Sequence, residues 1–474
     1  MATKRQKRKA YNTAKKVAKK NPTLVIVLIL LIILIVGGAF AYLYFSGNLN
    51  KILNKGTNDN TTTSITTTTT NNPIQTEDGI NENIIYDNLQ IHFLELGNEY
   101  AGDSVYIKAG EKDILIDAGS RANSASTIID YVKQYCTDGK LEYVIATHAH
   151  QDHIAGFAGE AKTATNYKGE TTTRNGVLYY FDVENLIDFA YQGEVKKTDI
   201  EKGVLATDNK NAVSSSYNTS TSVYGKYLLS REYAISNGTN HKTAKELWDN
   251  NSISFTLAEG ITMNILYNYF YFNPSNDENN YSVCTMLNYN NHHFIFTGDL
   301  EEEGENKLAE YYDSSTSLKT LPHCDLFKGG HHGSPTSSND CLLSKITPSI
   351  CCVCCCAGAT EYTPNNDNQF PSQEFINRIA KYTSRVYVTT MFNVETLKNE
   401  SLNGNIIVSF NGTNLGVKAS NNLIRLKDTE WFNADIYVDS KGNNVSGKTK
   451  TDFFTSGTKV KRRIWPANGN YKEV

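Results

Sequence analysis

Runs of apolar and β-branched residues alternate with helix-like patterns over most of the chain after residue 84. The predicted strands are 89–96, 104–109, 113–117, 142–147, 261–267, 282–288, 293–297, 323–328, 350–356, 386–390 and 405–410. The predicted helices are 124–135, 300–312, 339–346 and 372–383. Strands interleaved with helices are typical of an α/β sandwich, so we predict an α/β fold for residues 84–424.

Two segments of this region lack a clear pattern of their own. Residues 157–260 are polar and too long for a plain loop, so we expect an insertion that carries its own helices and strands and shapes the substrate site. Residues 425–474 form a C-terminal extension without a recognisable motif. Its basic run, 458–463, is more typical of a solvated charged surface than of a binding patch.

The pattern before residue 84 predicts where the protein is located rather than how it folds. Residues 23–45 contain no charge, and an α-helix needs about 20 residues to cross a bilayer. Lys and Arg crowd residues 1–22, so we predict a basic cytoplasmic tail, one transmembrane helix and an extracellular C-terminal part. The alternative is a signal peptide cleaved near Ala39-Phe40-Ala41, which would release a secreted protein. Residues 46–83, rich in Thr and Asn, are predicted to be a linker.

Composition changes this picture in one respect, the distribution of charge. The net charge of the 474 residues is −4, but nine positive residues and no acidic ones lie within residues 1–20, so the remainder carries −13. That balance argues against a protein that coats nucleic acid. A hydrophobic content of 39% with a single long apolar run also argues against a mostly disordered chain and a multi-span membrane protein.

The strongest chemical pattern follows the predicted strand 142–147. His148, His150, Asp152 and His153 form the sequence H-x-H-x-D-H. A tight turn after a strand lets closely spaced imidazoles converge, and imidazole with carboxylate is a donor set that suits Zn²⁺ or Mn²⁺. The spacing therefore predicts a metal site at the end of this strand.

Two further groups lie at the ends of later strands. Asp299 follows strand 293–297, and His331 and His332 follow strand 323–328. A carboxylate between two sets of imidazoles is able to bridge two metal ions, an arrangement used for displacement at phosphorus. Neighbouring side chains of an extended backbone point to opposite sides, so one of the two histidines is expected to bind metal and the other to contact substrate. The sequence does not distinguish them.

These residues resemble the metallo-β-lactamase superfamily, and within it the extracellular hydrolase domain of the competence proteins that import DNA. The resemblance covers residues 89–417 and rests on five motifs in the family's order: IHFLELGNEYAGDSVYI, LIDAG, THAHQDHIAG, FTGDL and KGGHHGS. It implies an αββα metallo-β-lactamase sandwich with the site at one edge of two facing sheets.

The resemblance also implies a role for each site residue. His148 and His150 would hold the first of two divalent metal ions, Zn or Mn, and Asp152 and His153 the second. Asp299 would bridge them, one of His331 and His332 would complete the second site, and Asp152 with these two histidines would act in catalysis. Asp103, Asp117 and Ser334 would lie behind the ligands or at the edge of the site.

The sequence departs from the family in two places. Many members have a further first-site histidine at the end of a strand, where this chain has Tyr267 and Asn268. The only histidines in that interval are His241, His292 and His293, which leaves the first metal site weak or open. In addition, residues 368–371 read Asn-Gln-Phe-Pro where competence-type domains often have Gly-His-Pro.

We therefore expect a membrane-anchored, metal-dependent hydrolase of phosphodiester bonds in DNA or a cell-wall phosphopolymer. Its expected partners are the membrane, through one helix, and an anionic phosphoester, with nucleic acid as one candidate. One alternative is a hydrolase of lactones, β-lactams or thioesters, because the same ligands serve many substrates. Others are a non-catalytic surface module that binds nucleic acid or a partner, and an inactive descendant with a structural metal site.

Five of the nine cysteines lie in residues 351–356, CCVCCC. Side chains in a strand alternate between its faces, so this run cannot direct all its thiols to one metal ion. We predict a buried strand in which cysteine serves as a small apolar residue.

Overall fold

The computed structural model describes residues 80–97, 101–193, 207–208, 222–313, 320–359, 365–393, 395–433, 435–443, 445 and 457–467. All of them lie within the compact unit of residues 72–474. The predicted basic tail 1–22, transmembrane segment 23–45 and linker residues 46–79 lie outside the described residues. Among those that are described, no helix combines the length and the apolar character needed to cross a membrane.

A mixed sheet of nine strands forms the first half of the fold, in the order β1–β21–β20–β2–β3–β4–β5–β8–β11. β2, β3 and β4 are antiparallel, whereas β4, β5, β8 and β11 run parallel. The bounds are β1 (Ile80–Glu82), β2 (Leu89–Phe93), β3 (Val105–Ala109), β4 (Lys112–Ile116), β5 (Lys140–Ile145), β8 (Asp182–Asp188), β11 (Asn240–Thr243), β20 (Ile406–Phe410) and β21 (Leu415–Ala419).

A second sheet of eight strands follows the order β12 to β19. It begins as an antiparallel meander from β12 to β15 and continues with parallel pairs from β15 to β18. The bounds are β12 (Ser254–Ala258), β13 (Ile261–Ile265), β14 (Thr285–Tyr289), β15 (His292–Phe296), β16 (Leu326–Lys328), β17 (Ile350–Ala357), β18 (Val386–Asn393) and β19 (Lys398–Ser401).

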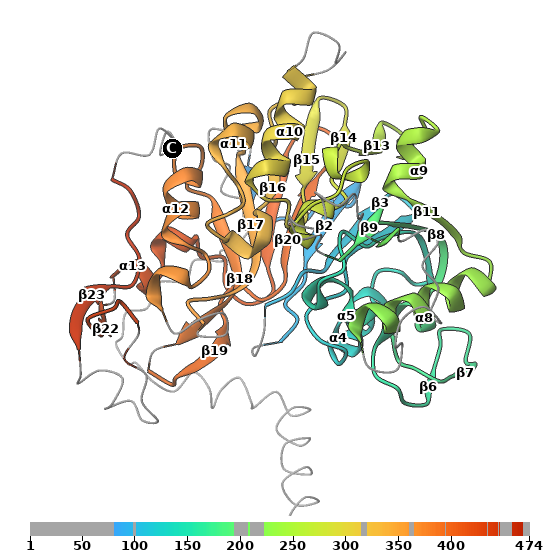
Figure 1. Ribbon diagram of the computed structural model, residues 1–474, viewed down its shortest axis with the longest axis horizontal. Coiled ribbons are helices and arrows are strands. Elements are labelled where there is room, and N and C mark those ends of the chain that lie inside the picture. The colour runs from blue at the N-terminus through green and yellow to red at the C-terminus, as the bar shows by residue number, and fades with distance from the viewer. Residues whose placement is uncertain are drawn as a thin grey trace, which may run out of the picture. The chain divides into compact units, whose positions relative to one another are not determined.

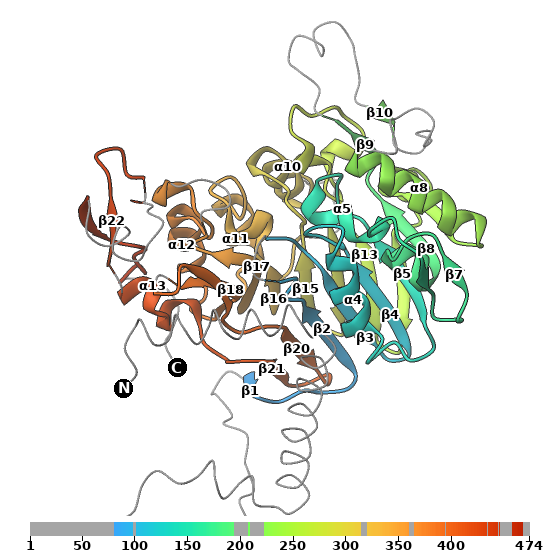
Figure 2. The ribbon, with the colours of Figure 1, turned by 90° about the horizontal axis from the view of Figure 1, so that it is seen from below.

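Helices cover the outer sides of both sheets. In Figures 1 and 2, α4, α5 and α8 lie along the first sheet and α10, α11 and α12 along the second. The bounds are α4 (Ser124–Val132), α5 (Gln151–Ala158), α6 (Val177–Tyr180), α8 (Val223–Ser236), α9 (Ala244–Asp249), α10 (Glu302–Asp313), α11 (Asp340–Ile346), α12 (Gln373–Ile379) and α13 (Glu430–Asn433). The α/β architecture predicted from the sequence is confirmed.

The apolar core lies between the sheets and continues under the helices. Phe93 of β2 stacks on Phe296 of β15 with ring centres 6.4 Å apart, which joins the inner faces of the two sheets. On β17, Cys352 and Cys354 pack into this inner core, whereas Cys351 and Cys355 pack under the helices of the second sheet. The cysteine run is therefore a fully buried strand with alternating faces, and its thiols are free.

The structure corrects the predicted segment boundaries. Residues 80–82, expected at the end of the linker, form β1 because Ile80 is buried and the strand pairs with β21. Segment 157–260 supplies β8 and β11 to the first sheet, together with α6, α8 and α9. The C-terminal extension adds α13, whose Trp431 is fully buried in the core under the second sheet's helices.

Short two-stranded sheets lie outside the two main sheets. Their strands are β6 (Ala164–Thr165) with β7 (Thr171–Thr172), β9 (Tyr191–Gln192) with β10 (Thr207–Asp208), and β22 (Asp435–Val438) with β23 (Thr458–Lys461). The β22–β23 ribbon belongs to the C-terminal extension, so the described part of that extension is folded.

Candidate metal centre

The first half of the centre lies at the carboxyl ends of β4 and β5. Asp117 directly follows β4, and its carboxylate accepts hydrogen bonds from the backbone N–H of Thr147 (2.8 Å) and from the Thr147 hydroxyl (2.7 Å). His153 Nδ1 lies 2.8 Å from the same carboxylate. Asp117 therefore orients the His153 ring so that its other nitrogen, Nε2, faces the second sheet.

The H-x-H-x-D-H segment runs from the end of β5 into α5. His148 and His150 precede the helix, and Asp152 and His153 lie in its first turn. His148 Nε2 is 3.0 Å from His150 Nδ1, and the rings of His148 and His153 are 4.1 Å apart. His148 and His153 are fully buried, whereas 27% of the Asp152 side chain is exposed. The structure thus brings these four side chains together.

A close backbone approach holds α5 in this position. A Cβ atom on Gly119 would lie 1.5 Å from the carbonyl oxygen of Asp152, so only glycine fits there. The backbone N–H of Ala118 donates to the carbonyl of His153 (2.7 Å), and that of Gly156 donates to Ala118 (2.5 Å). The LIDAG segment is therefore the support against which the histidine helix packs.

The second half of the centre comes from the second sheet. Asp299 follows β15, and His331 and His332 lie in a 3-10 segment, Gly330–Gly333, after β16. Both histidines have left-handed backbone conformations, with φ of 46° and 52°, so the expectation of an extended backbone was wrong. His332 is fully buried, whereas 21% of the His331 side chain is exposed. The turn, rather than strand alternation, separates the two side chains.

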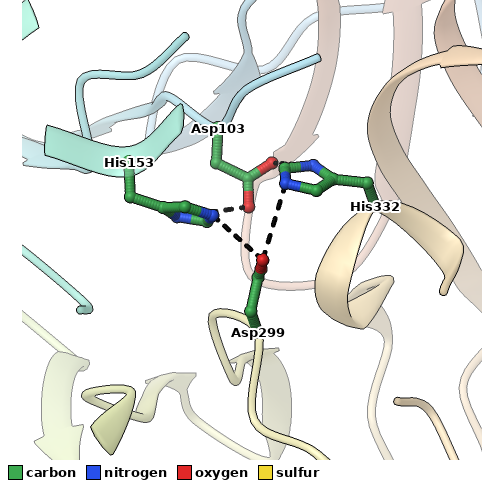
Figure 3. A group of neighbouring side chains, drawn as sticks. All are labelled: Asp103, His153, Asp299 and His332. Atoms are coloured by element: carbon green, nitrogen blue, oxygen red, sulfur yellow. Dashed lines mark hydrogen bonds and ion pairs between the residues drawn. The ribbon is translucent and has the colours of Figure 1, made fainter. Parts of the chain in front are cut away.

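Figure 3 shows four buried side chains whose candidate ligand atoms all lie within 4.8 Å of one another: Asp103, His153, Asp299 and His332. Asp299 Oδ2 is 3.0 Å from His153 Nε2 and 3.5 Å from His332 Nε2. His332 Nε2 is also 3.2 Å from Asp152 Oδ2. The carboxylate of Asp299 therefore lies between imidazoles contributed by the two halves of the fold.

His331 occupies the outer side of this cluster. Its Nε2 is 3.9 Å from Asp299 Oδ2, and its Nδ1 is 3.4 Å from Glu301 Oε1. Ser334 lies farther along the same turn, where its hydroxyl hydrogen-bonds with that of Thr336 (2.9 Å). His331 is therefore placed to meet a ligand, whereas Ser334 supports the turn.

Two members of the cluster were not expected as such from the sequence. Asp103, which was predicted at the edge of the site, is 1% exposed. Its Oδ1 lies 3.3 Å from His332 Nδ1. Its Oδ2 is 2.5 Å from Nζ of Lys328, a buried lysine at the end of β16 that is also 3.7 Å from Asp299 Oδ1. Lys328 was missed, although its position directly before Gly-Gly-His-His at a strand end was a usable signal.

Charge pairing dominates the electrostatics of the cluster. Burial lowers the pKa of His153, but Asp299 and Asp117 outweigh burial and hold that pKa well above its ordinary value. Burial likewise opposes a charged His332, yet Asp103 and Asp299 raise its pKa. Burial raises the pKa of Asp299, whereas His153 and His332 hold it well below the ordinary range. These carboxylates attract positive charge strongly, from an imidazolium or from a bound cation.

The donor atoms fit a divalent metal ion. Asp299 Oδ1 is buried and has no hydrogen-bond partner among the described residues, so it has capacity for a further ligand. Imidazole nitrogen with carboxylate oxygen is the chemistry that Zn²⁺ and Mn²⁺ accept. The cluster is therefore a candidate divalent-metal centre.

The three additional histidines considered from the sequence are engaged elsewhere. His241 Nε2 pairs with Asp188 (2.8 Å), His292 Nδ1 with Asp325 (2.9 Å) and His293 Nδ1 with Asn288 (2.8 Å).

Asn268, which lies where the resemblance led us to expect a further histidine, is also engaged. Its side-chain amide donates to the backbone carbonyls of Asn280 (2.8 Å) and Ser282 (3.0 Å), so it holds the backbone of residues 280–282 in place.

The C-terminal extension contacts the loop beside the centre. Phe370 lies with its ring 5.7 Å from that of His331, and Arg463 donates to the carbonyl of Pro371 (3.1 Å). Arg462 and Arg463 are 5% and 2% exposed and lie over the Trp431 ring. The basic run was predicted as a solvated surface, and for these two arginines that prediction was wrong, because an aromatic ring and backbone carbonyls bury their guanidinium groups.

Residues 97–179 match the family model described as the metallo-beta-lactamase superfamily. The matched segment contains Asp103, Asp117 and the H-x-H-x-D-H residues, so this part of the chain resembles a metallo-β-lactamase superfamily domain. Among curated proteins, the chain is 24% identical over 155 residues to Recombination protein 2 of Haemophilus influenzae. The match covers 33% of this chain and only 16% of that protein.

The chain is also similar to solved structures. The metallo-beta-lactamase fold protein YhfI from Bacillus subtilis aligns at 10% identity with a TM-score of 0.32, over 63% of this chain and 95% of that one. The short form of human tRNase Z aligns at 12% identity with a TM-score of 0.28, over 64% and 92%.

Proposed function

We propose that this protein is a metal-dependent phosphodiesterase. The observation that carries the proposal is the position of Asp299, whose Oδ2 lies 3.0 Å from His153 Nε2 and 3.5 Å from His332 Nε2. One carboxylate between imidazoles of two sheets is suited to bridging two cations, the arrangement that serves displacement at phosphorus. The similarity to Recombination protein 2 supports nucleic acid as the first substrate class to test.

The proposed ligands are His148 and His150 for one cation, Asp152, His153 and His332 for the other, and Asp299 between them. Two bound Zn²⁺ or Mn²⁺ ions would supply Lewis acidity and a water of lowered pKa. The buried Asp117 and the close-packed Gly119 hold this ligand loop in place. The first cation has fewer protein ligands, since the additional histidine of many relatives is absent here.

Side chains of the centre would carry out the proton transfer and the hydrogen bonding to the substrate. Asp152 is the most accessible carboxylate of the cluster, and it orients the attacking water and accepts its proton. His331, with 21% of its side chain exposed, faces the open side and donates a proton or hydrogen bond to a phosphate oxygen. His332 is buried against Asp103 and Cys354 O (2.9 Å), so it serves as a ligand rather than as a mobile acid.

The proposal retains the predicted placement of the enzyme. The apolar run 23–45, preceded by a basic tail, supports a single membrane anchor with the hydrolase domain outside the cell. Protease treatment of intact cells tests this: the domain should be cleaved from the surface, and full protection of it would contradict the extracellular placement.

A substrate panel tests the chemistry. The purified full chain with Mn²⁺ or Zn²⁺ should hydrolyse bis-p-nitrophenyl phosphate and DNA but not a chromogenic β-lactam. Asp152→Ala should lower turnover by about 100-fold or more, because it removes the proton acceptor. Asp130→Ala, at an exposed helix position, is the matched control. No turnover with two metals bound would contradict an enzyme, and turnover of the lactam alone would contradict the phosphoester assignment.

A further inference from the structure

A cavity lies on the outer side of the second sheet, away from the residues of the metal cluster. Its volume is about 850 Å³, and its floor is the outer face of β13, β14 and β15. Figure 1 shows β13 and β14 running between α10 and α9, which contribute the walls. Asp299 of the metal cluster follows the carboxyl end of β15, whereas His293 of the cavity lies at the beginning of that strand. The cavity therefore lies along the outer face of the sheet, and none of its described lining residues belongs to the metal cluster.

The floor carries a continuous row of polar side chains. Thr262, Asn288 and His293 are direct neighbours in register across three strands, and Asn264 lies beside them. Alternate residues on the same strands, such as Met263 and Leu287, are buried in the core between the sheets. The polar row is thus the solvent-side face of a sheet whose other face is apolar.

Asn288 is the hub of this row. Its side-chain Nδ2 donates to Asn264 Oδ1 (2.7 Å) and Thr262 Oγ1 (3.2 Å), and its side-chain Oδ1 accepts from His293 Nδ1 (2.8 Å). These bonds fix the His293 tautomer with Nε2 as an acceptor and direct Asn264 Nδ2 as a donor. Burial lowers the pKa of His293, so the ring keeps that acceptor at neutral pH. The row presents preoriented donors and acceptors side by side.

Aromatic side chains form the wall above the polar row. Trp248 of α9 and Tyr311 of α10 line the cavity, and their rings meet edge-on with centres 5.8 Å apart. Tyr267, which does not line the cavity, stacks on Tyr311 at 3.9 Å and holds that ring in place. The Trp248 indole N–H donates to the carbonyl of Leu266 (3.2 Å), which holds the ring in place. Rigid aromatic surface of this kind packs well against the C–H faces of a ring-shaped ligand.

Free polar groups beside aromatic rings indicate the ligand class. None of the described residues that line the cavity is Asp, Glu, Lys or Arg. An anionic ligand would find no counter-charge among these described residues, and a purely apolar ligand would leave the Asn264 donor and the His293 acceptor unsatisfied. A neutral polyhydroxylated ring meets both conditions, since its hydroxyls pair with amides and imidazole while its C–H faces contact aromatic rings.

We propose that this cavity binds a neutral oligosaccharide. The site is separate from the phosphodiesterase centre and does not depend on its activity. It would hold the protein on a glycan-containing surface while the metal centre acts on a different group.

Calorimetric titration of the full chain with chitotriose, maltotriose and cellotriose tests the proposal. At least one of them should bind, and Trp248→Ala and Asn288→Asp should each weaken that binding by about tenfold or more. The matched controls are Trp465→Ala and Asn240→Asp, which replace the same residue types outside the cavity and should leave the affinity unchanged. All variants should keep their turnover of bis-p-nitrophenyl phosphate, which also reports that they are folded.

Should Trp248→Ala fail to fold, His293→Ala is a second test. It removes the acceptor nitrogen Nε2 and should also weaken sugar binding. Failure of all three neutral sugars to bind at millimolar concentration would overturn the proposal. Equal loss of affinity in the control variants would do the same, as would competition for the site by a heparin oligosaccharide with equal affinity, because the cavity would then not select neutral ligands.

Discussion

Lys328 Nζ lies 2.5 Å from Asp103 Oδ2 inside the cluster that otherwise consists of imidazoles and carboxylates. Burial lowers the pKa of this lysine, but Asp103 and Asp299 outweigh burial and raise it, so the ammonium stays charged. A permanent cation beside the Asp299 carboxylate offsets part of the negative charge of the centre.

Lys328→Met should therefore destabilise the metal-free protein. Removing one partner leaves Asp103 buried without its cation, which costs about 3–5 kcal/mol of unfolding free energy. Urea unfolding in the presence of a chelator measures this cost. Lys345→Met breaks another 2.5 Å ion pair, with Asp313, in which both side chains are about 40% exposed, and it should cost less than about 1 kcal/mol. Equal losses of unfolding free energy in the two variants would show that the buried Lys328–Asp103 pair contributes no more to stability than an exposed pair.

The two adjacent histidines should respond differently to alanine substitution. His332→Ala removes a fully buried nitrogen near both Asp152 and Asp299, so bound metal should fall from about two ions to about one per chain. His331→Ala should leave the metal content unchanged and lower turnover about 100-fold. Elemental analysis together with bis-p-nitrophenyl phosphate turnover separates these outcomes. Loss of metal in His331→Ala alone would reverse the assignment.

Gly119→Ala should abolish metal binding. The new Cβ would meet the Asp152 carbonyl oxygen at 1.5 Å and push the first turn of α5 away from the cluster. Gly169→Ala is a useful control, since its φ is +82° but no atom lies within 4 Å of the position that its new methyl group would take. It should cost about 1 kcal/mol of stability and leave metal content intact. Normal metal binding by Gly119→Ala would contradict the close approach.

Glu305 should make stability depend on pH. Burial raises its pKa to about 7, although Ser338 and Asn339 donate hydrogen bonds to it. Between the ordinary glutamate pKa and 7, the unfolded chain has lost this proton and the folded chain retains it. The unfolding free energy should therefore fall as pH rises, by about 3 kcal/mol in total. Glu305→Gln should remove this slope in urea unfolding between pH 5 and 7.

Glu310→Gln, at an exposed position of the same helix, should retain the slope. A slope that persists in Glu305→Gln would assign the pH dependence to other groups.

Much of the fold could be predicted because its signals are local. The strand before His148 and the strand before Asp299 are short apolar runs that end in polar motifs, and both lie where expected. The alternation of Cys351 and Cys352 between two cores follows from the period of a strand. In contrast, β8 and β11 were not recognised, because their mixed patterns become strands only beside β5.

The sequence by itself determined which residue types can meet a metal ion and at which strand ends they stand, since motif spacing and strand period are properties of neighbouring residues. Only the tertiary structure decided that Asp103 enters the cluster, that Lys328 balances it, and that His332 rather than His331 is buried. Those outcomes depend on how two sheets far apart in sequence face each other and on a left-handed turn, and neither leaves a pattern in the sequence that periodicity can detect.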